Sequence, residues 1–85
     1  MPERVALCLL RWALAFGEEV DGGGLELRGL SQDELSQAVA ASVQHVQETL
    51  KALRSEGLLH TGRLRFWLPD PDRLGHFIAK ADRGN

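Results

Sequence analysis

A cluster of side chains between residues 42 and 51 could contact the bases and the phosphates of double-stranded DNA. Gln44 carries an amide that can pair with N6 and N7 of adenine, and Val43 could pack on the methyl group of thymine. His45 could donate a hydrogen bond to a phosphate, and Lys51 lies further along the chain, within reach of a phosphate or a base edge. For Gln44 and His45 the alternative is a solvated helix face. These residues indicate nucleic-acid recognition only if one helix presents them together.

The helix that would present them begins at Ser42 and ends before Gly57. The Ser42 hydroxyl can accept a hydrogen bond from a free N–H group of the first turn. Val46, Leu50 and Leu53 then recur at i, i+4 and i+7, which forms a single apolar stripe. Gly57 suits the left-handed conformation that commonly ends a helix. The spacing therefore predicts an amphipathic helix.

A shorter helix precedes it. Ser31 and Glu34 form the S-x-x-E pattern of a capping box, and Leu35 and Val39 follow on one face. Two helices joined by a tight turn make a helix-turn-helix over residues 31–56, a motif whose second helix enters the major groove. Such helix pairs also occur in small all-α domains that bind no DNA.

Two short strands around a basic turn follow the helix pair and form a wing over residues 58–68. Leu58–Leu59 begins the first strand, His60–Arg63 is the turn, and Leu64–Leu68 is the second strand. The alternation predicts that one face of the second strand carries Leu64, Phe66 and Leu68 and the other carries Arg65 and Trp67.

The first helix is predicted over residues 4–16 and is apolar nearly all round. Eleven of the twelve residues from Val5 to Phe16 are apolar, and Arg11 is the exception. A helix on the surface of a small domain needs only one apolar stripe. We therefore expect a second face to meet something outside this chain, with Trp12 and Phe16 as interface anchors. Their alternative role is to fill the core.

The remaining segments connect these elements. Glu18–Gly24 is predicted to be a loop, and Leu25–Leu27 alternates like a short strand. Asp72 is predicted to cap a last short helix, 72–81, before a frayed tail at 82–85. In that helix one face carries Leu74, Phe77 and Ile78.

The composition fits one soluble domain over residues 1–85. Apolar residues make up 44% of the chain and charged residues 26%, and the net charge is −2, which argues against a strong non-specific grip on nucleic acid. The longest apolar run, Val5–Leu10, is too short for a membrane span, and no convincing signal peptide is present. We therefore expect a cytoplasmic protein.

The sequence offers no argument for an enzyme, a metal or a cofactor. His45, His60 and His76 lie on different predicted elements with no Asp or Cys at metal-site or triad spacing. Cys8, the single cysteine, lies in an apolar run and is expected to be a buried, inert thiol. Gly22–Gly24 lacks the Lys and the spacing of a phosphate-binding loop.

Four motifs, in order, resemble the C-terminal DNA-binding domain of the Crp/Fnr family of bacterial transcription regulators. They are R-x-A-x-x-L-L at Arg4–Leu10, LSQDELSQAVAAS at Leu30–Ser42, V-x-x-x-L-x-x-L-x-x-x-G-L-L at Val46–Leu59 and D-P-x-x-L at Asp70–Leu74. The resemblance covers nearly the whole chain. It implies a mainly α fold with a small β-hairpin wing, that is, a winged helix-turn-helix.

The resemblance also implies roles for individual residues. The family places Ser at the start of the recognition helix, often followed by Arg, Glu and Thr, with another Arg one turn later. Ser42 matches the cap and phosphate position, but Val43 and Glu48 stand where the family has its guanine-reading arginines. The candidate DNA-contacting residues are Gln32, Ser42, Val43, Gln44, His45, Glu48, Lys51, Thr61, Gly62 and Arg63, with Arg28 as a weaker phosphate contact. Thr61-Gly62-Arg63 matches the family's wing tip.

Two kinds of partner follow from these patterns. The first is double-stranded DNA. Intact family members also carry an N-terminal sensor domain and a dimerisation helix, which this sequence does not include. The chain is then an excised output domain or a stand-alone domain. Trp12 and Phe16 would contact the second copy in a homodimer or the missing sensor domain. The alternative is a winged-helix protein–protein interaction module that has lost DNA readout. The acidic balance of residues 31–56, Glu48 and Trp67 favour that alternative.

Overall fold

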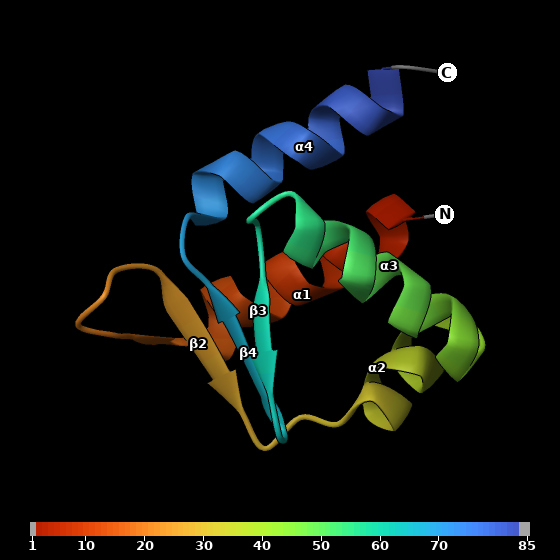
Figure 1. Cartoon of the computed structure of the whole chain (residues 1–85), viewed down its shortest axis with the longest axis horizontal. Helices are drawn as coiled ribbons and strands as arrows, with labels where there is room; N and C mark the ends of the chain where they lie inside the picture. The colour runs from red at the N-terminus through yellow and green to blue at the C-terminus, as the bar shows by residue number, and fades with distance from the viewer. Residues whose placement is uncertain (1, 84–85) are drawn as a thin grey trace.

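The structure, a computed structural model, describes the backbone of residues 2–83, which forms four helices and four short strands (Figure 1). Side chains are described for residues 4–80. The elements are α1 (Pro2–Phe16), β1 (Glu18–Glu19), β2 (Leu25–Arg28), α2 (Gln32–Val39), α3 (Val43–Ser55), β3 (His60–Gly62), β4 (Arg65–Leu68) and α4 (Pro71–Arg83). The predicted mainly α, winged helix-turn-helix fold is confirmed.

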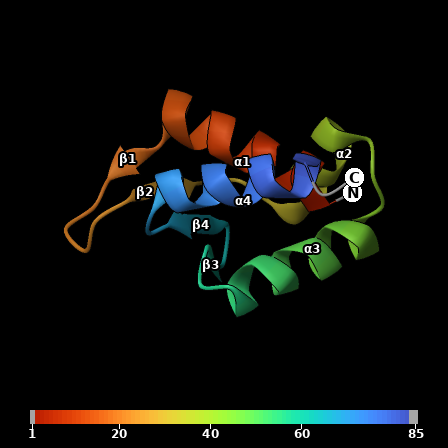
Figure 2. The same cartoon turned by 90° about the horizontal axis from the view of Figure 1, so that it is seen from above.

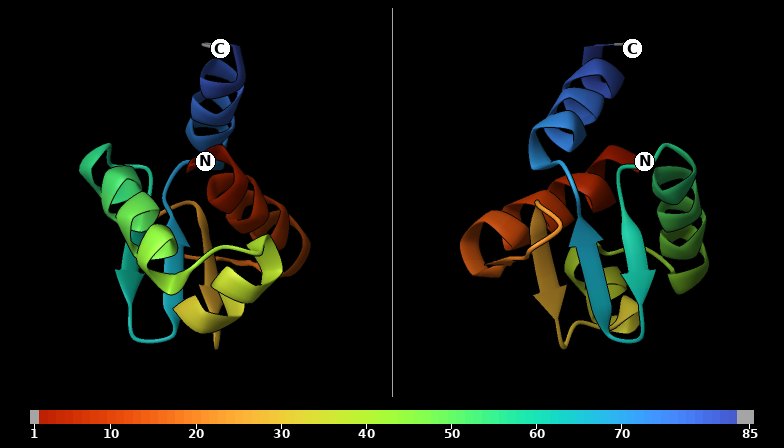
Figure 3. Two further views of the ribbon diagram at one scale, coloured as in Figure 1. Left: turned by 90° about the vertical axis from the view of Figure 1, so that its right-hand side faces the viewer. Right: turned by 60° about the vertical axis from the view of Figure 1, so that its left-hand side comes forward.

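The strands form one antiparallel sheet in the order β1-β2-β4-β3, so the wing hairpin β3–β4 continues into β2. The prediction of a loop throughout Glu18–Gly24 is wrong, because Glu18 and Glu19 pair with β2. The first wing strand begins at His60, not at Leu58. Helices α1, α2 and α3 lie on one side of the sheet, and no helix of residues 2–83 covers the other face (Figure 3).

Leu64 does not lie in the wing strand as predicted. Gly62 pairs with Arg65, so the chain reverses through Arg63 and Leu64, and Leu64 adopts a left-handed backbone with a φ of 52°. A tight two-residue turn commonly requires such a conformation. Its side chain is therefore 52% exposed, and the core face of β4 is formed by Phe66 and Leu68 alone.

The core lies between the sheet and the first three helices, and Leu74 of α4 is buried in the same cluster. The fully buried side chains include Leu9 of α1, Leu35 of α2, Leu50 and Leu53 of α3, and Leu68 of β4. This single core holds the helix-turn-helix against the wing. No helix in the described part of the chain is long and apolar enough to cross a membrane.

Local caps fix the ends of α2 and α3 as the sequence predicts. The backbone N–H of Glu34 donates to Ser31 Oγ at 3.1 Å, and Glu34 Oε1 accepts from the Ser31 N–H in return. Ser42 Oγ accepts from the N–H of His45 at 3.1 Å. Gly57 follows α3 with a φ of 71°, and the Leu58 N–H donates back to the carbonyl of Leu53 at 3.0 Å. These last contacts are a Schellman motif.

Helix α4 is longer than the predicted 72–81 and has a different cap. Asp70 Oδ1, not Asp72, accepts a hydrogen bond from the backbone N–H of Arg73 at 3.2 Å. Pro71 can then occupy the first helical position, where its missing N–H costs nothing. The helix runs on to Arg83, so it includes part of the predicted tail, and residues 84–85 lie outside the described residues. It packs along α1 (Figure 2).

Candidate nucleic-acid interface

Helix α3 presents a polar stripe on the side opposite its buried one. Val46, Leu50 and Leu53 are 0% exposed and point into the core. Gln44, Glu48 and Lys51 lie at i, i+4 and i+7 and are exposed, with Gln47 exposed beside Glu48. The helix therefore carries its base-reading candidates on one solvent-facing surface, as a recognition helix requires.

The stripe forms one wall of a shallow hollow of about 490 Å³ between α2 and α3. Its lining residues are all polar or charged: Gln32 from α2, and Gln44, Gln47, Glu48, Lys51 and Arg54 from α3. Four of the predicted site residues are thus brought together. Gln47 and Arg54 were missed by the sequence analysis, although each continues the helical period of the same face.

The N-terminus of α3 opens beside this hollow. Ser42 satisfies one N–H group of the first turn, and the first turn holds no acidic residue. Helix N-termini carry partial positive charge and bind phosphates through their free N–H groups. Val43 and His45 lie in this turn and are half-buried, and the His45 carbonyl accepts a hydrogen bond from Thr49 Oγ1.

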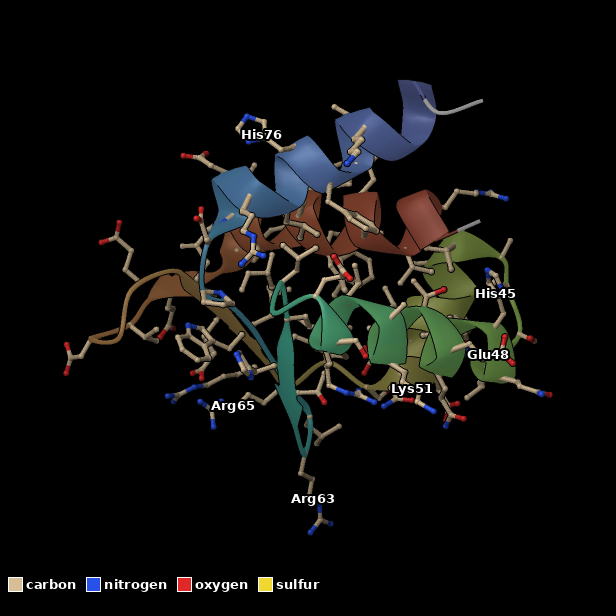
Figure 4. All side chains as sticks on the ribbon, turned by 45° about the horizontal axis from the view of Figure 1, so that its top comes forward. His45, Glu48, Lys51, Arg63, Arg65 and His76 are labelled. Atoms are coloured by element: carbon tan, nitrogen blue, oxygen red, sulfur yellow. The ribbon has the colours of Figure 1, made fainter. Side chains whose placement is uncertain are left out.

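The wing is tied to α3 by one side-chain hydrogen bond. Arg54 Nη1 donates to Thr61 Oγ1 at 3.2 Å. Thr61 is half-buried, Gly62 is exposed at the end of β3, and Arg63 extends away from the body of the molecule at the wing tip (Figure 4). Of the three predicted wing residues, Arg63 is thus placed best to reach a phosphate.

The open face of the sheet holds a buried carboxylate between two arginines. Glu26 is 3% exposed, and its two oxygens accept hydrogen bonds from Arg28 Nε, at 2.5 Å, and from Arg65 Nε. Arg28 and Arg65 are directly opposite one another in register, so Glu26 offsets the repulsion between them. The hydrogen bond from Arg28 lowers the pKa of Glu26, and burial of the carboxylate opposes that change.

Both guanidinium groups remain accessible to a further partner. The side chains of Arg28 and Arg65 are 73% and 55% exposed. Figure 4 shows Arg65, Arg63, Lys51, Glu48 and His45 spread along one edge of the molecule. The cations from β4, the wing tip and α3 therefore follow one edge.

The three histidines lie on different elements of the described chain. His76 lies on α4, at the edge opposite His45 and Lys51 (Figure 4), and His60 stacks on Trp67 with ring centroids 5.0 Å apart. Among the described residues, no group of three or more His, Cys, Asp and Glu could hold a metal ion. Burial raises the pKa of the half-buried Cys8 thiol, which disfavours its nucleophilic thiolate form.

The sequence matches the family model described as the Crp-like helix-turn-helix domain over residues 3–77. This chain belongs to that family. The match spans α1 through most of α4, so it includes both helices of the helix-turn-helix and the wing. A comparison with curated proteins found no match.

Solved structures of Crp/Fnr-type regulators have the same fold. TTHB099, a CRP family transcriptional regulator from Thermus thermophilus, is 28% identical with a TM-score of 0.79, covering 92% of this chain and 40% of that chain. TTHA1359, a CRP/FNR family regulator from the same organism, is 25% identical with a TM-score of 0.81, covering 93% and 40%. The CO-dependent transcription factor CooA from Carboxydothermus hydrogenoformans is 24% identical with a TM-score of 0.80, covering 91% and 36%. This chain thus spans less than half the length of each.

Proposed function

We propose that this chain is the DNA-binding domain of a Crp/Fnr-like transcription regulator, with α3 inserted into the major groove. One observation carries the proposal: the exposed polar stripe of α3 is held by a fully buried apolar stripe on its opposite side, and the wing tip lies on the same edge of the molecule. Family membership favours this function over the protein-interaction module.

Within this proposal, side chains of the α3 stripe contact bases. Gln44 pairs with adenine, Val43 packs on a thymine methyl group, and Glu48 accepts from a base amino group. Lys51, further along the helix, reaches a base edge or a phosphate.

Backbone contacts come from the surrounding elements. Phosphate contacts position a protein on DNA without reading sequence. The candidate phosphate contacts are Gln32, Ser42, His45, Thr61, Gly62 and Arg63, together with Arg28 and Arg65 on the open face of the sheet. The Arg54–Thr61 hydrogen bond holds the wing at a fixed position relative to α3.

A partner for α1 completes the proposal. Leu14 is 67% exposed and Phe16 76% exposed at the end of this helix, whereas Trp12 is half-buried against the core. We expect a second copy or a sensor domain to cover Leu14 and Phe16. A dimer would place two α3 helices roughly 34 Å apart on a two-fold site.

The test is a fluorescence-anisotropy titration with random-sequence duplex DNA at low and at physiological salt. Binding through phosphates weakens with salt with a slope of about −0.9 for each phosphate neutralised. Arg63→Ala should reduce the slope by about 0.9. Lys80→Ala removes an exposed cation from α4 and should leave it unchanged. Absence of binding at low salt, or equal slopes for both variants, would contradict the proposal.

A further inference from the structure

The first two turns of α3 expose hydrogen-bonding side chains and hold no lysine or arginine. Gln44, Gln47 and Glu48 are exposed and line the hollow between α2 and α3, and Lys51 is the first lysine or arginine of the helix. In the described part of the chain these three side chains make no hydrogen bond or ion pair with another residue. Their polar groups are therefore available to a ligand.

The Glu48 carboxylate selects for hydrogen-bond donors, and the amide oxygens of Gln44 and Gln47 can accept from the same donors. A carboxylate only accepts hydrogen bonds, and an amide accepts through its oxygen while donating through its nitrogen. In the major groove the donors are the exocyclic amino groups, N6 of adenine and N4 of cytosine. Guanine O6 and thymine O4 are acceptors, so either one would face the Glu48 carboxylate with no proton between them.

The charge of Glu48 strengthens this selection. A carboxylate close to DNA phosphates is repelled, and this repulsion is present on every sequence. A hydrogen bond from an amino group offsets the repulsion only where such a group faces Glu48. A buried acceptor that is left unsatisfied costs more than the hydrogen bond itself contributes.

We infer that the N-terminal half of α3 reads exocyclic amino groups, so that methylation of adenine N6 or cytosine N4 in the half-site blocks binding. The inference rests on the proposed function, because it requires α3 to enter the major groove. Base pairing uses one hydrogen of each amino group, and the other faces the groove. A methyl group at N6 or N4 replaces this second hydrogen and leaves Gln44, Gln47 or Glu48 facing carbon.

The test begins with selection of a high-affinity duplex from a random library by the 85-residue chain. The selected duplex is then synthesised with N6-methyladenine or N4-methylcytosine at single positions, and binding is measured by fluorescence anisotropy. Methylation of at least one adenine or cytosine should lower the affinity about tenfold or more. Cytosine methylated at C5 keeps its amino group and serves as the matched control, with a much smaller effect expected.

Variants connect the methylation effect to α3. Gln44→Ala and Gln47→Ala should each weaken binding, whereas Glu48→Ala should relax the discrimination against guanine and thymine at the position that Glu48 faces. Each variant should remove the additional loss caused by methylation at the position that residue reads. Gln37→Ala removes an exposed glutamine of α2 that does not line the hollow, and it should retain the full effect.

The two proposals fail in distinguishable ways. If no duplex binds, the proposed function fails and this inference fails with it. If duplexes bind but N6 and N4 methylation have no effect, only the inference is overturned. An effect of methylation that persists unchanged in all three α3 variants overturns the assignment to these side chains.

Discussion

At the scale of single residues, Glu26 is a carboxylate that is almost wholly buried on the open face of the sheet. Removing a charged group from water is unfavourable unless it is paired. Here both oxygens are hydrogen-bonded to arginines, one on its own strand and one on β4. Glu26 lies between Arg28 and Arg65 and offsets the repulsion between them across β2 and β4. The site is therefore a three-residue unit in which each charge depends on the others.

Glu26→Gln should lower stability at neutral pH, because the amide keeps the shape but leaves two cations facing one another. The pKa of Glu26 is lowered in the folded state, so its ionisation contributes stability above the ordinary value of 4.5, and this contribution is lost as the pH falls through the lowered pKa. The difference in urea midpoint between the variant and the wild type should thus be largest near pH 7 and shrink below pH 4.5.

Glu19→Gln is the matched control for this pH series, since Glu19 is an exposed carboxylate on β1. Its urea midpoint should differ little from that of the wild type at any pH. A Glu26→Gln variant as stable as the wild type at pH 7 would show that the arginines do not depend on the carboxylate.

At the scale of elements, the helix ends are set by local chemistry. Gly57 ends α3 in the left-handed conformation, and a Cβ there would meet no atom closer than Arg73 Nη1 at 3.7 Å. Gly57→Ala should therefore lower the free energy of unfolding by about 1–2 kcal/mol through backbone strain alone. Urea denaturation measures the loss. Gly22→Ala, at a position without positive φ and with space for a Cβ, should not destabilise the protein, and equal losses in both variants would contradict this account.

The same local character explains which elements could be predicted from the sequence. The caps at Ser31, Ser42 and Gly57 act within a few residues, so the pattern alone located α2 and α3. Strand β1 has only two residues and exists because β2 lies beside it, which no local pattern reveals. Asp70 and Asp72 flank the same proline, and the preference of proline for the first helical position is the local signal that would have identified Asp70 as the cap.

The candidate interface likewise combines residues that the sequence predicts with contacts that the sequence does not reveal. Gln44, Glu48 and Lys51 follow from helical periodicity, and Gln47 lies within the same period. The Arg54–Thr61 hydrogen bond joins α3 to β3, and Arg65 reaches a residue 39 positions earlier in the chain. Such contacts depend on how the sheet and helices pack, so the sequence alone does not contain a signal for them.

At the scale of the whole molecule, the surfaces proposed for DNA and for a partner lie on different sides. Helix α3 lies at one side of the molecule and α1 at the other, with α4 between them in the view of Figure 2. Leu14 and Phe16 are 67% and 76% exposed at the end of α1. A partner covering them would leave the polar stripe of α3 open. Under the proposed function, this separation allows the domain to bind DNA while it is joined to a second unit.

Replacing both exposed residues, as Leu14→Ser and Phe16→Ser, should reduce self-association of the isolated chain at high concentration, because less apolar surface is available for burial. Sedimentation velocity would measure this as a shift towards the monomer. Folding stability should change by only about 0.5 kcal/mol for each substitution, because both side chains are largely exposed. DNA affinity per monomer should stay unchanged, since α3 is not altered.

Leu64→Ser removes another exposed apolar side chain, at the wing turn, and should leave association as it is. If Leu64→Ser reduces association as strongly as the double variant, general surface hydrophobicity rather than the end of α1 drives it.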